Sequence, residues 1–569
     1  MNSKLKLAML AAGSILVLNA CSSKQPGETT VENVVPPPPP PPAPPPPPPP
    51  PPKASGVMDM QRAVSPSQAY SPTPMPIMEP PPVDRERYED VDDNPVKRVA
   101  DEPVSTFSVD VDTASYARTR RFLTDGTLPP KDAVRVEELI NYFDYSYPLP
   151  EAADPPFSTN VSVVPSPWKS GNELIQIGLQ GYNIEADERP AMNLTLLVDV
   201  SGSMSSPDKL PLAKKALGML VDNMSEKDTI SVAVYAGAAG MVLEPTPGNK
   251  KSKIMAALEG MAAGGSTAGG EGLRLAYSLA EQNFDEDSVN RVMLLTDGDF
   301  NVGVTSDERL EDFVSRKRDS GVFLSVMGFG RGNYNDAMMQ KIAQAGNGMA
   351  AYVDTVNEAR KLLNDDLSGS LFTIAKDVKI QVEFNPAKVS EYRLIGYETR
   401  MLDEADFNND KVDAGEIGAG HTVTALYEVT PVGADSALTG ERRYEGNKSG
   451  ETNADPSAEY GFLKLRYKLP DEDTSKLIEV PITNDLAFET LDEAPLYTRF
   501  ATAVAGFGQL LKGSSFISDD FDYDSVIELA LDARGEDAFG YRSEFVQLAR
   551  SAKTAAAQET LEQKNRGGD

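Results

Sequence analysis

The sequence predicts a doubly wound α/β domain over residues 190–370, preceded by a small α+β segment and followed by a mixed β-then-α segment. Strand-like and helix-like runs alternate through residues 190–370. The first strand, 192–198, is almost entirely apolar, as expected for a parallel sheet that is buried on both faces. Polar turns rich in glycine follow two of the strands, where ligands of such sheets bind.

The elements expected in this domain follow from apolar periodicity and from glycine-containing turns. The strands are 192–198, 230–235, 291–296, 322–327 and 350–353, and the helices are 209–224, 252–261, 270–282, 307–319, 336–345 and 357–368.

The segments on either side are interpreted as two further domains, 104–185 and 371–560. The first contains strands 107–111, 158–164 and 174–179 and helices 113–123 and 133–143. The second contains strands 378–384, 421–429, 460–469 and 476–482, then helices 495–511, 523–532 and 542–558. Residues 561–569 are expected to form a disordered tail.

The N-terminus predicts a lipid anchor. Lys4 and Lys6 precede a short apolar run, and residues 18–21 (LNAC) end it with the only cysteine of the chain. This resembles a lipobox, so residues 1–20 are expected to be a lipoprotein signal peptide and Cys21 the acylated residue that ties the chain to a membrane. Because Ser22 is not aspartate, an outer-membrane address facing the periplasm is expected. An ordinary secretory signal is the alternative.

Residues 21–103 are expected to form a disordered stalk. Residues 36–52 are all proline except Ala43. Such a run adopts polyproline II and, at about 3.1 Å per residue, reaches roughly 50 Å. A ligand for aromatic grooves is the other use of a proline run.

Composition excludes several functions. The formal charge of −32 is unsuited to nucleic acid, so no nucleic-acid partner is expected. Acylation of Cys21 leaves no thiol, and His421 is the only histidine, which excludes zinc sites built from several histidines. The metal chemistry that remains uses oxygen ligands.

Five oxygen-bearing side chains lie at the predicted strand ends. Asp199, Ser201 and Ser203 follow the first strand, Thr267 lies in the glycine-rich run 264–270, and Asp297 follows strand 291–296. Parallel strands bring these positions to one edge of a sheet. A few carboxylates with hydroxyls and waters are the ligands that Mg²⁺ prefers.

In this order the residues resemble the metal-ion-dependent adhesion site of the von Willebrand factor A (VWA) family, which has a Rossmann-like fold. The resemblance implies that Ser201, Ser203 and Thr267 bind the metal through their hydroxyls. It implies that Asp199 and Asp297 hold metal-bound waters or bind directly. An acidic residue of a partner then fills the open position. Mg²⁺ is expected, with Mn²⁺ and Ca²⁺ left open.

The flanking segments resemble the other two domains of a family of bacterial VWA lipoproteins. Residues 105–123 (STFSVDVDTASYARTRRFL) are similar to its N-terminal domain, and residues 413–431 (DAGEIGAGHTVTALYEVTP) to its C-terminal domain of unknown function. The expected function is therefore metal-dependent binding of an unidentified envelope protein, without enzymatic activity. A structural scaffold whose metal only stabilises the fold is the alternative.

Three other sequence patterns resemble functional motifs but have simpler interpretations. Asp112, in the pair Asp110 and Asp112, is expected to cap the helix that follows. Residues 406–413 resemble a calcium loop, but Lys411 replaces its glycine, so an acidic surface turn is expected.

The third pattern mimics the motifs of penicillin-binding serine acyltransferases. It is a remote alternative, because its first motif also occurs elsewhere in the chain. Its residues are Ser206 with Lys209, Ser288 with Asn290, and Lys448 with Gly450.

Overall fold

The computed structural model describes Tyr88 and residues 91–109, 112–151, 154–185, 188–265, 269–298, 307–331, 336–439 and 459–566. All of them belong to Pro80–Asp569, one of two units into which the chain divides. The predicted signal peptide, Cys21 and the proline run lie outside the described residues. None of the described helices combines the length and the apolar character that crossing a membrane requires.

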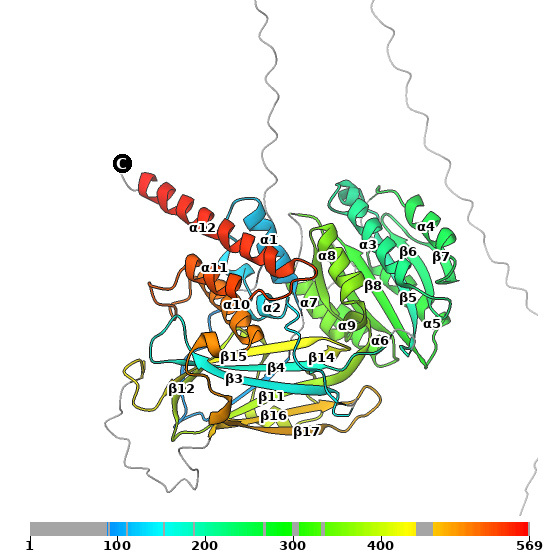
Figure 1. Ribbon diagram of the computed structural model, residues 1–569. Helices are drawn as coiled ribbons and strands as arrows, with labels where there is room; N and C mark the ends of the chain where they lie inside the picture. The colour runs from blue at the N-terminus through cyan, green and yellow to red at the C-terminus, as the bar shows by residue number, and fades with distance from the viewer. Residues whose placement is uncertain are drawn as a thin grey trace, which may run out of the picture. The chain divides into compact units, whose positions relative to one another are not determined.

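The α/β domain is built on a six-stranded sheet, which confirms the predicted doubly wound fold (Figure 1). The strand order is β10-β9-β8-β5-β6-β7, and every neighbouring pair is parallel except β6 and β7. The strands are β5 (Ala191–Asp199), β6 (Thr229–Tyr235), β7 (Ala239–Pro247), β8 (Ser288–Thr296), β9 (Phe323–Phe329) and β10 (Ala350–Val353).

Helices cover both faces of this sheet because the central strands are apolar on both faces. On β5, Leu194, Leu196 and Val198 pack with the layer that holds α3, α4 and α8, whereas Leu197 packs with the layer of α5, α6 and α7. The helices are α3 (Leu210–Asn223), α4 (Lys251–Gly260), α5 (Gly269–Gln282), α6 (Asp307–Arg318), α7 (Asp336–Ala345), α8 (Val356–Arg360) and α9 (Leu367–Leu371). A π-helical turn, η3 (Lys361–Asp365), separates α8 from α9.

Strand β7 was not predicted. It is an edge strand that contains two prolines, and its residues Met241 and Val242 are exposed. Prolines are tolerated at sheet edges, and exposed apolar residues break the alternation by which a half-buried strand is recognised.

Two antiparallel sheets make up most of the rest of the described chain. The first has the order β1 (Lys97–Arg98), β12 (Val389–Ile395), β15 (Thr422–Pro431), β4 (Glu173–Gly181) and β3 (Phe157–Pro165). The second has the order β13 (Met401–Leu402), β2 (Val104–Ser108), β11 (Thr373–Phe384), β16 (Glu459–Lys468) and β17 (Lys476–Thr483), and β14 (Gly415–Gly418) also pairs with β11.

These sheets combine strands from both sides of the α/β domain. Strand β2 pairs with β11, and β4 pairs with β15. The segments 104–185 and 371–560, expected as separate domains, therefore share both sheets. Pairing between strands more than 200 residues apart leaves no trace in local periodicity, which is why the sequence did not predict it.

The two antiparallel sheets pack face to face through aromatic rings. The ring of Tyr427 on β15 contacts two phenylalanine rings of the other sheet. Its centroid lies 6.2 Å from that of Phe107 on β2 and 5.2 Å from that of Phe384 on β11. Phe157 of β3 meets Tyr467 of β16 at 4.9 Å. We call this pair of sheets the sandwich.

A helical layer covers the outer face of the first sheet, as Figure 1 shows. Val164, Leu174 and Leu426 of that sheet pack with Phe500 and Phe545 of the C-terminal helices. The helices are α1 (Ala114–Thr124), α2 (Val136–Ile140), α10 (Leu496–Lys512), α11 (Tyr523–Asp532) and α12 (Tyr541–Arg566).

The predicted C-terminal end of the stalk and the predicted disordered tail both differ from the structure. Residues 91–103, assigned to the stalk, include β1, and Val99 among them is buried. The expected disorder of 561–569 is wrong for residues 561–566, which continue α12. These residues read LEQKNR, in which leucine, glutamate, glutamine, lysine and arginine favour a helix, and the first glycine after them, a helix breaker, is Gly567.

A buried arginine joins three parts of the chain. Arg120 of α1 contacts Asp354, which follows β10, and its Nη atoms lie 2.6 Å from Glu358 of α8 and 3.0 Å from Glu544 of α12. The Arg120 side chain is 4% exposed. Burial alone lowers the pKa of Arg120, but Glu358, Tyr142 and Asp354 outweigh it and raise that pKa well above its ordinary value. The arginine therefore stays charged.

Replacing Arg120 with Met should lower the midpoint of thermal unfolding sharply. Removing one partner of a buried ion pair costs about 3–5 kcal/mol, and here buried carboxylates from separate elements lose their cation together. Differential scanning calorimetry of the purified chain measures the effect. Lys253→Met is the control, because Lys253 and Glu244 form an exposed pair. A midpoint equal to that of the control would contradict this role of Arg120.

Candidate functional site

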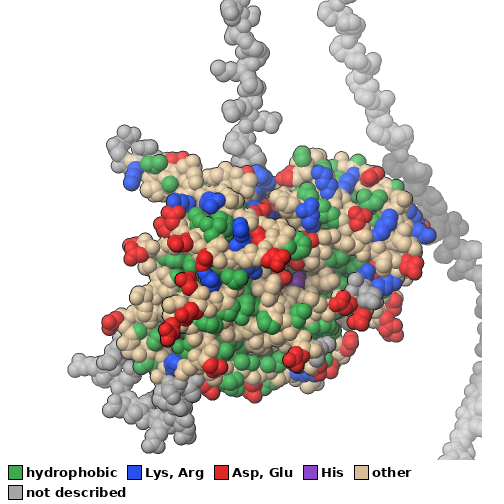
Figure 2. All heavy atoms as spheres, in the orientation of Figure 1, with side chains coloured by type: hydrophobic (Ala, Val, Ile, Leu, Met, Phe, Trp, Pro, Cys, Tyr) green, Lys and Arg blue, Asp and Glu red, His purple; other side chains and the backbone are tan. Residues whose placement is uncertain are grey.

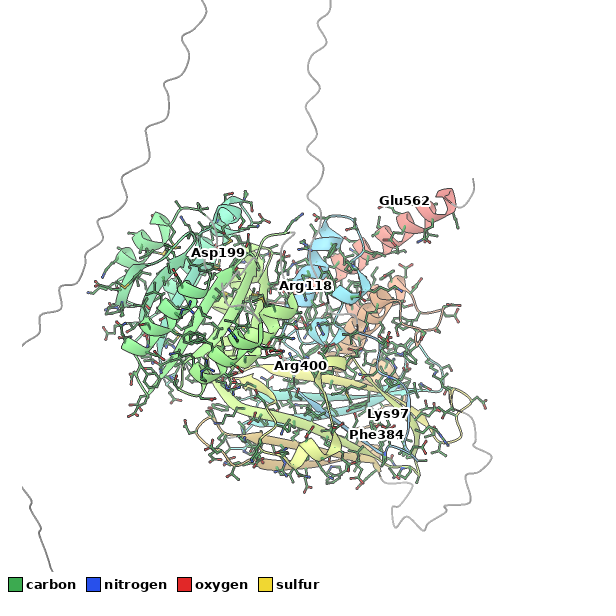
Figure 3. The ribbon with its side chains drawn as sticks, turned by 180° about the vertical axis from the view of Figure 1, so that it is seen from behind. Lys97, Arg118, Asp199, Phe384, Arg400 and Glu562 are labelled. Atoms are coloured by element: carbon green, nitrogen blue, oxygen red, sulfur yellow. The ribbon has the colours of Figure 1, made fainter. Side chains whose placement is uncertain are left out.

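Asp199 is a buried carboxylate at the end of the central strand β5. The backbone N–H of Ser201 donates to its Oδ1 at 2.8 Å, and the hydroxyl of Thr296 donates to Oδ2 at 3.5 Å. Burial raises the pKa of Asp199; the hydrogen bonds from Ser201 oppose this rise and the charge of Asp297 adds to it. Among the described residues no lysine, arginine or histidine forms an ion pair with Asp199. Figure 3 labels this residue within the α/β domain.

Two serine hydroxyls lie beside this carboxylate on one short loop. Ser201 Oγ and Ser203 Oγ are 3.0 Å apart, across the start of the 3-10 turn η2 (Gly202–Ser205). Ser201 is buried, whereas Ser203 is exposed, so the pair forms the boundary between the sheet and solvent.

The glycine-rich run 264–270 is hydrogen-bonded to the same loop. Gly202 N–H donates to Gly265 O at 3.1 Å, and Gly264 N–H donates to Val200 O at 2.7 Å. Gly265 has a φ of +92°, a left-handed conformation that favours glycine. Thr267, the third predicted hydroxyl ligand, lies outside the described residues.

Asp297 carries an ion pair that the sequence did not reveal. It follows β8, which is the neighbour of β5 in the sheet. The ammonium of Lys209 donates to Asp297 Oδ2 at 2.8 Å, and both side chains are buried. Lys209 immediately precedes α3, and its sequence spacing suggested only the acyltransferase pattern with Ser206, not a contact with Asp297.

The structure thus brings together four of the five predicted ligands, Asp199, Ser201, Ser203 and Asp297, at one edge of the sheet. Their donor set, two carboxylates with two hydroxyls, is oxygen only and fits a hard divalent cation. Sequence analysis did not predict that Lys209 and the buried Tyr235 lie at this site. The pKa of Tyr235 is raised by burial and, to a lesser extent, by the charge of Asp199.

Comparison with known proteins agrees with this geometry. Residues 193–365 match the von Willebrand factor type A domain, and residues 82–176 match the family described as von Willebrand factor. Residues 369–555 match the family described as "Uncharacterized protein YfbK, C-terminal". The chain is therefore a VWA-domain protein, a class whose A domain typically mediates protein–protein interaction.

A full-length relative narrows the assignment. The Escherichia coli (strain K12) protein named "Uncharacterized protein YfbK" is 44% identical over 468 residues, which cover 81% of this chain and 80% of that protein. The chain belongs to the YfbK family of VWA-domain proteins.

Similarity to other proteins is more limited. The Synechocystis "Uncharacterized protein sll0103" is 32% identical over 185 residues, covering 32% of this chain and 43% of that one. A solved structure, "von Willebrand factor type A from Catenulispora acidiphila", is 14% identical, covers 70% of this chain and 91% of its own, and has a TM-score of 0.38.

Asp112 does not cap a helix, contrary to the sequence-based expectation. The N-cap of α1 is Thr113, which makes no side-chain capping bond. Asp112 instead accepts from Ala350 N–H at 3.1 Å and pairs with Arg400 at 3.1 Å. A tertiary charge partner therefore outweighs the local capping bond. Asp110 lies outside the described residues.

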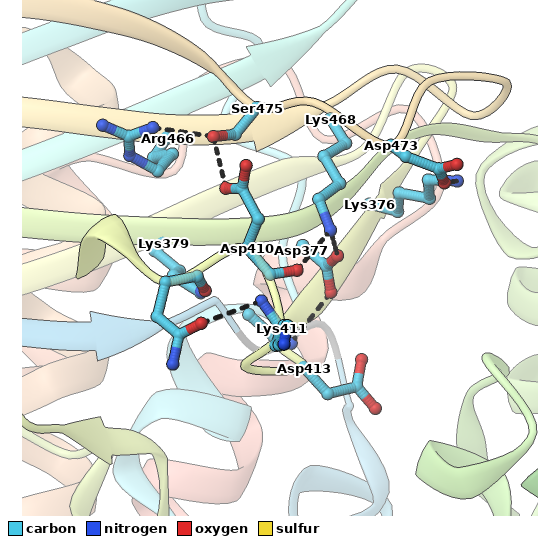
Figure 4. A network of polar contacts seen from close by, with 12 residues as sticks. Lys376, Asp377, Lys379, Asp410, Lys411, Asp413, Arg466, Lys468, Asp473 and Ser475 are labelled. Carbon is cyan, nitrogen blue, oxygen red and sulfur yellow. Dashed lines mark hydrogen bonds and ion pairs between the residues drawn. The ribbon is translucent and has the colours of Figure 1, made fainter. Parts of the chain in front are cut away.

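The acidic segment 406–413 is built around lysine side chains (Figure 4). Lys379 Nζ donates to the carbonyls of Asp406 and Asn409 at 3.1 and 2.7 Å. Lys468 Nζ donates to Asp410 O and Asp377 Oδ2, both at 2.7 Å. Backbone carbonyls of this segment therefore accept hydrogen bonds from ammonium groups of β11 and β16.

The acyltransferase pattern is not assembled around one centre. Lys209 Nζ is bound to Asp297, and Ser206 Oγ donates to Asp208 at 2.5 Å. Ser288 begins β8, whereas Asp297 follows its end, so the two lie about 30 Å apart at 3.3 Å per residue. Lys448 lies outside the described residues.

Asp199→Asn should stabilise the chain in the presence of EDTA. Asparagine retains an oxygen for Ser201 N–H while removing a buried negative charge, and relief of such a charge contributes at least about 1 kcal/mol. Thermal unfolding of both proteins in EDTA measures this. Asp222→Asn, an exposed change on α3, serves as the control. A lower midpoint for Asp199→Asn than for wild type would show that the carboxylate is compensated within the fold.

Proposed function

We propose that the VWA domain binds a divalent metal, Mg²⁺ in the first instance, and uses it to capture a carboxylate of another protein. The observation that carries this proposal is Asp199, a fully buried carboxylate with no cation partner among the described residues, next to two serine hydroxyls. Ser201, Ser203 and Thr267 would hold the ion through their hydroxyls, with Asp199 and Asp297 supporting it directly or through water. The bound metal supplies a positively charged open position that attracts an acidic side chain.

The proposed partner is an envelope protein that offers an acidic residue. Proteins with VWA domains and YfbK-like relatives are generally interaction proteins rather than enzymes. A lipid anchor at Cys21 would hold the chain at the outer membrane, facing the periplasm. The negative net charge would disfavour adsorption to anionic lipid heads, so the anchor and the partner would determine where the protein resides.

Capture of partners should require both the metal and Asp199. Cells expressing tagged wild-type chain, Asp199→Ala or Asp222→Ala are cross-linked, and captured proteins are compared with and without EDTA. Asp222 matches the charge change and is exposed on α3. Wild type and Asp222→Ala should retain the same partners, which EDTA and Asp199→Ala should remove. Partners captured equally by Asp199→Ala and in EDTA would refute the proposal.

The same preparation distinguishes a scaffold role. If Mg²⁺ raises the unfolding midpoint of wild type while the captured proteins are unchanged by EDTA, the metal stabilises the fold and does not mediate binding.

Lys209→Met should make the fold depend on metal. Without Lys209, Asp297 becomes a second buried carboxylate lacking its cation, at a cost of about 3–5 kcal/mol. Mg²⁺ replaces that charge, so the rise in unfolding midpoint on adding Mg²⁺ should be larger for Lys209→Met than for wild type or for Lys215→Met, an exposed neighbour. An equal rise in all three would contradict competition between Lys209 and the metal.

A further inference from the structure

A cavity of about 260 Å³ lies where the α/β domain meets the sandwich. Arg291 and Met349 contribute walls from the α/β domain, and Val109, Thr373, Glu416 and His421 contribute walls from the sandwich side. Arg291 precedes Thr296 by five residues on β8, so the cavity lies about 17 Å from the proposed metal site. In Figure 3 Arg400, another lining residue, lies at this junction and Asp199 lies away from it.

Arg291 is a buried cation without a carboxylate partner in the described part of the chain. The residue is 2% exposed. Its Nη1 donates to Ser325 Oγ at 2.6 Å, and its Nε has no hydrogen-bond partner. Burial lowers the pKa of Arg291, and the nearby charge of Glu416 opposes this. A buried cation of this kind is costly unless an anion reaches it.

The other charged groups of the cavity are already compensated. Arg400 pairs with Asp112 at 3.1 Å, and Asp413 pairs with Arg318 at 3.0 Å. Burial lowers the pKa of His421, which favours its neutral form. Arg291 is therefore left as the cation that faces the cavity without an ion pair.

Glu416 provides a second polar contact beside Arg291. Thr373 Oγ1 donates to Glu416 Oε2 at 3.0 Å. Burial raises the pKa of Glu416 to about 7, with Arg291 and Thr373 opposing the rise and Asp413 and Asp377 adding to it. Near neutral pH a large fraction of Glu416 is thus protonated, and a protonated carboxyl donates a hydrogen bond to an anion.

We propose that this cavity binds a small organic carboxylate, whose carboxylate group pairs with the Arg291 guanidinium and accepts a hydrogen bond from Glu416. Planar guanidinium and carboxylate groups match in geometry, and charge-assisted hydrogen bonds between them are strong. The cavity volume lies just below the usual range for ligand sites, about 300–1,000 Å³, which restricts the ligand to a few carbon atoms or to the C-terminal residue of a peptide. This binding does not depend on the metal site.

Isothermal titration calorimetry of the full chain in EDTA tests the proposal. The probes are acetate, succinate and the dipeptide Ala-Ala, each compared with its neutral amide, and inorganic phosphate. At least one carboxylate should bind saturably with one site per chain, and its amide should bind at least tenfold more weakly. Acetate or succinate binding would identify a free acid, and binding of Ala-Ala alone would identify a peptide terminus.

Three variants make the result specific to the cavity. Arg291→Met should abolish binding and raise the unfolding midpoint of the ligand-free chain, because an unpaired buried cation is replaced by an apolar side chain. Ala414→Phe should fill the cavity from another wall and also abolish binding. Arg466→Met, a partly buried arginine of β16, should leave binding unchanged. Any one of four results would overturn the proposal. No probe binds saturably, an acid and its amide bind equally well, phosphate binds as tightly as the carboxylates, or Arg291→Met retains binding.

Discussion

Pairing between strands on opposite sides of the VWA domain is the constraint on which the structure depends. Strands β2 and β4 precede that domain in the chain, and β11 and β15 follow it, yet β2 pairs with β11 and β4 with β15. The sandwich cannot form until the segments before and after the VWA domain meet. The Arg120 cluster adds a second tie, because it connects α1 to α8 of the VWA domain and to α12 near the C-terminus. Strand pairing and ion pairing therefore hold the VWA domain against the same neighbours.

Buried charge is handled in two ways within this chain. Lysine ammonium groups compensate Asp297 and the carbonyls of segment 406–413 from within the fold. Asp199 and Arg291 are different, because neither has an ion-pair partner among the described residues. Fold stability alone gives no reason to keep such groups, since apolar residues of similar size are often as good or better. On the face of the molecule in Figure 2, acidic and basic side chains are both scattered over the surface, where contact with water lowers the cost of an unpaired charge.

The sequence predicted what local pattern controls. The alternating elements of the VWA domain and the strand-end positions of Asp199, Ser201 and Asp297 follow from periodicity and from the topology of parallel sheets. Contacts between residues far apart in the chain could not be predicted from the sequence. Strand β12 was missed because it is buried almost throughout and includes Glu391 and Arg393, whose buried polar contacts come from distant residues such as Glu428. The pairing of Lys209 with Asp297 and that of Asp112 with Arg400 escaped prediction for the same reason.

Strand β4 precedes the VWA domain in the chain, β11 follows it, and the two strands approach each other at the ends that face this domain. Gly181, at the end of β4, lies so close to Ile374, at the start of β11, that an added Cβ would come within 2.8 Å of the Ile374 side chain. The chain therefore leaves the sandwich for the VWA domain and returns to the sandwich at nearly the same place. A domain whose ends are close together enters a loop of another fold at little cost in chain entropy. In topology the VWA domain is therefore an insertion between β4 and β11 of the sandwich, and the continuity of the sandwich does not require the chain to span a long distance there.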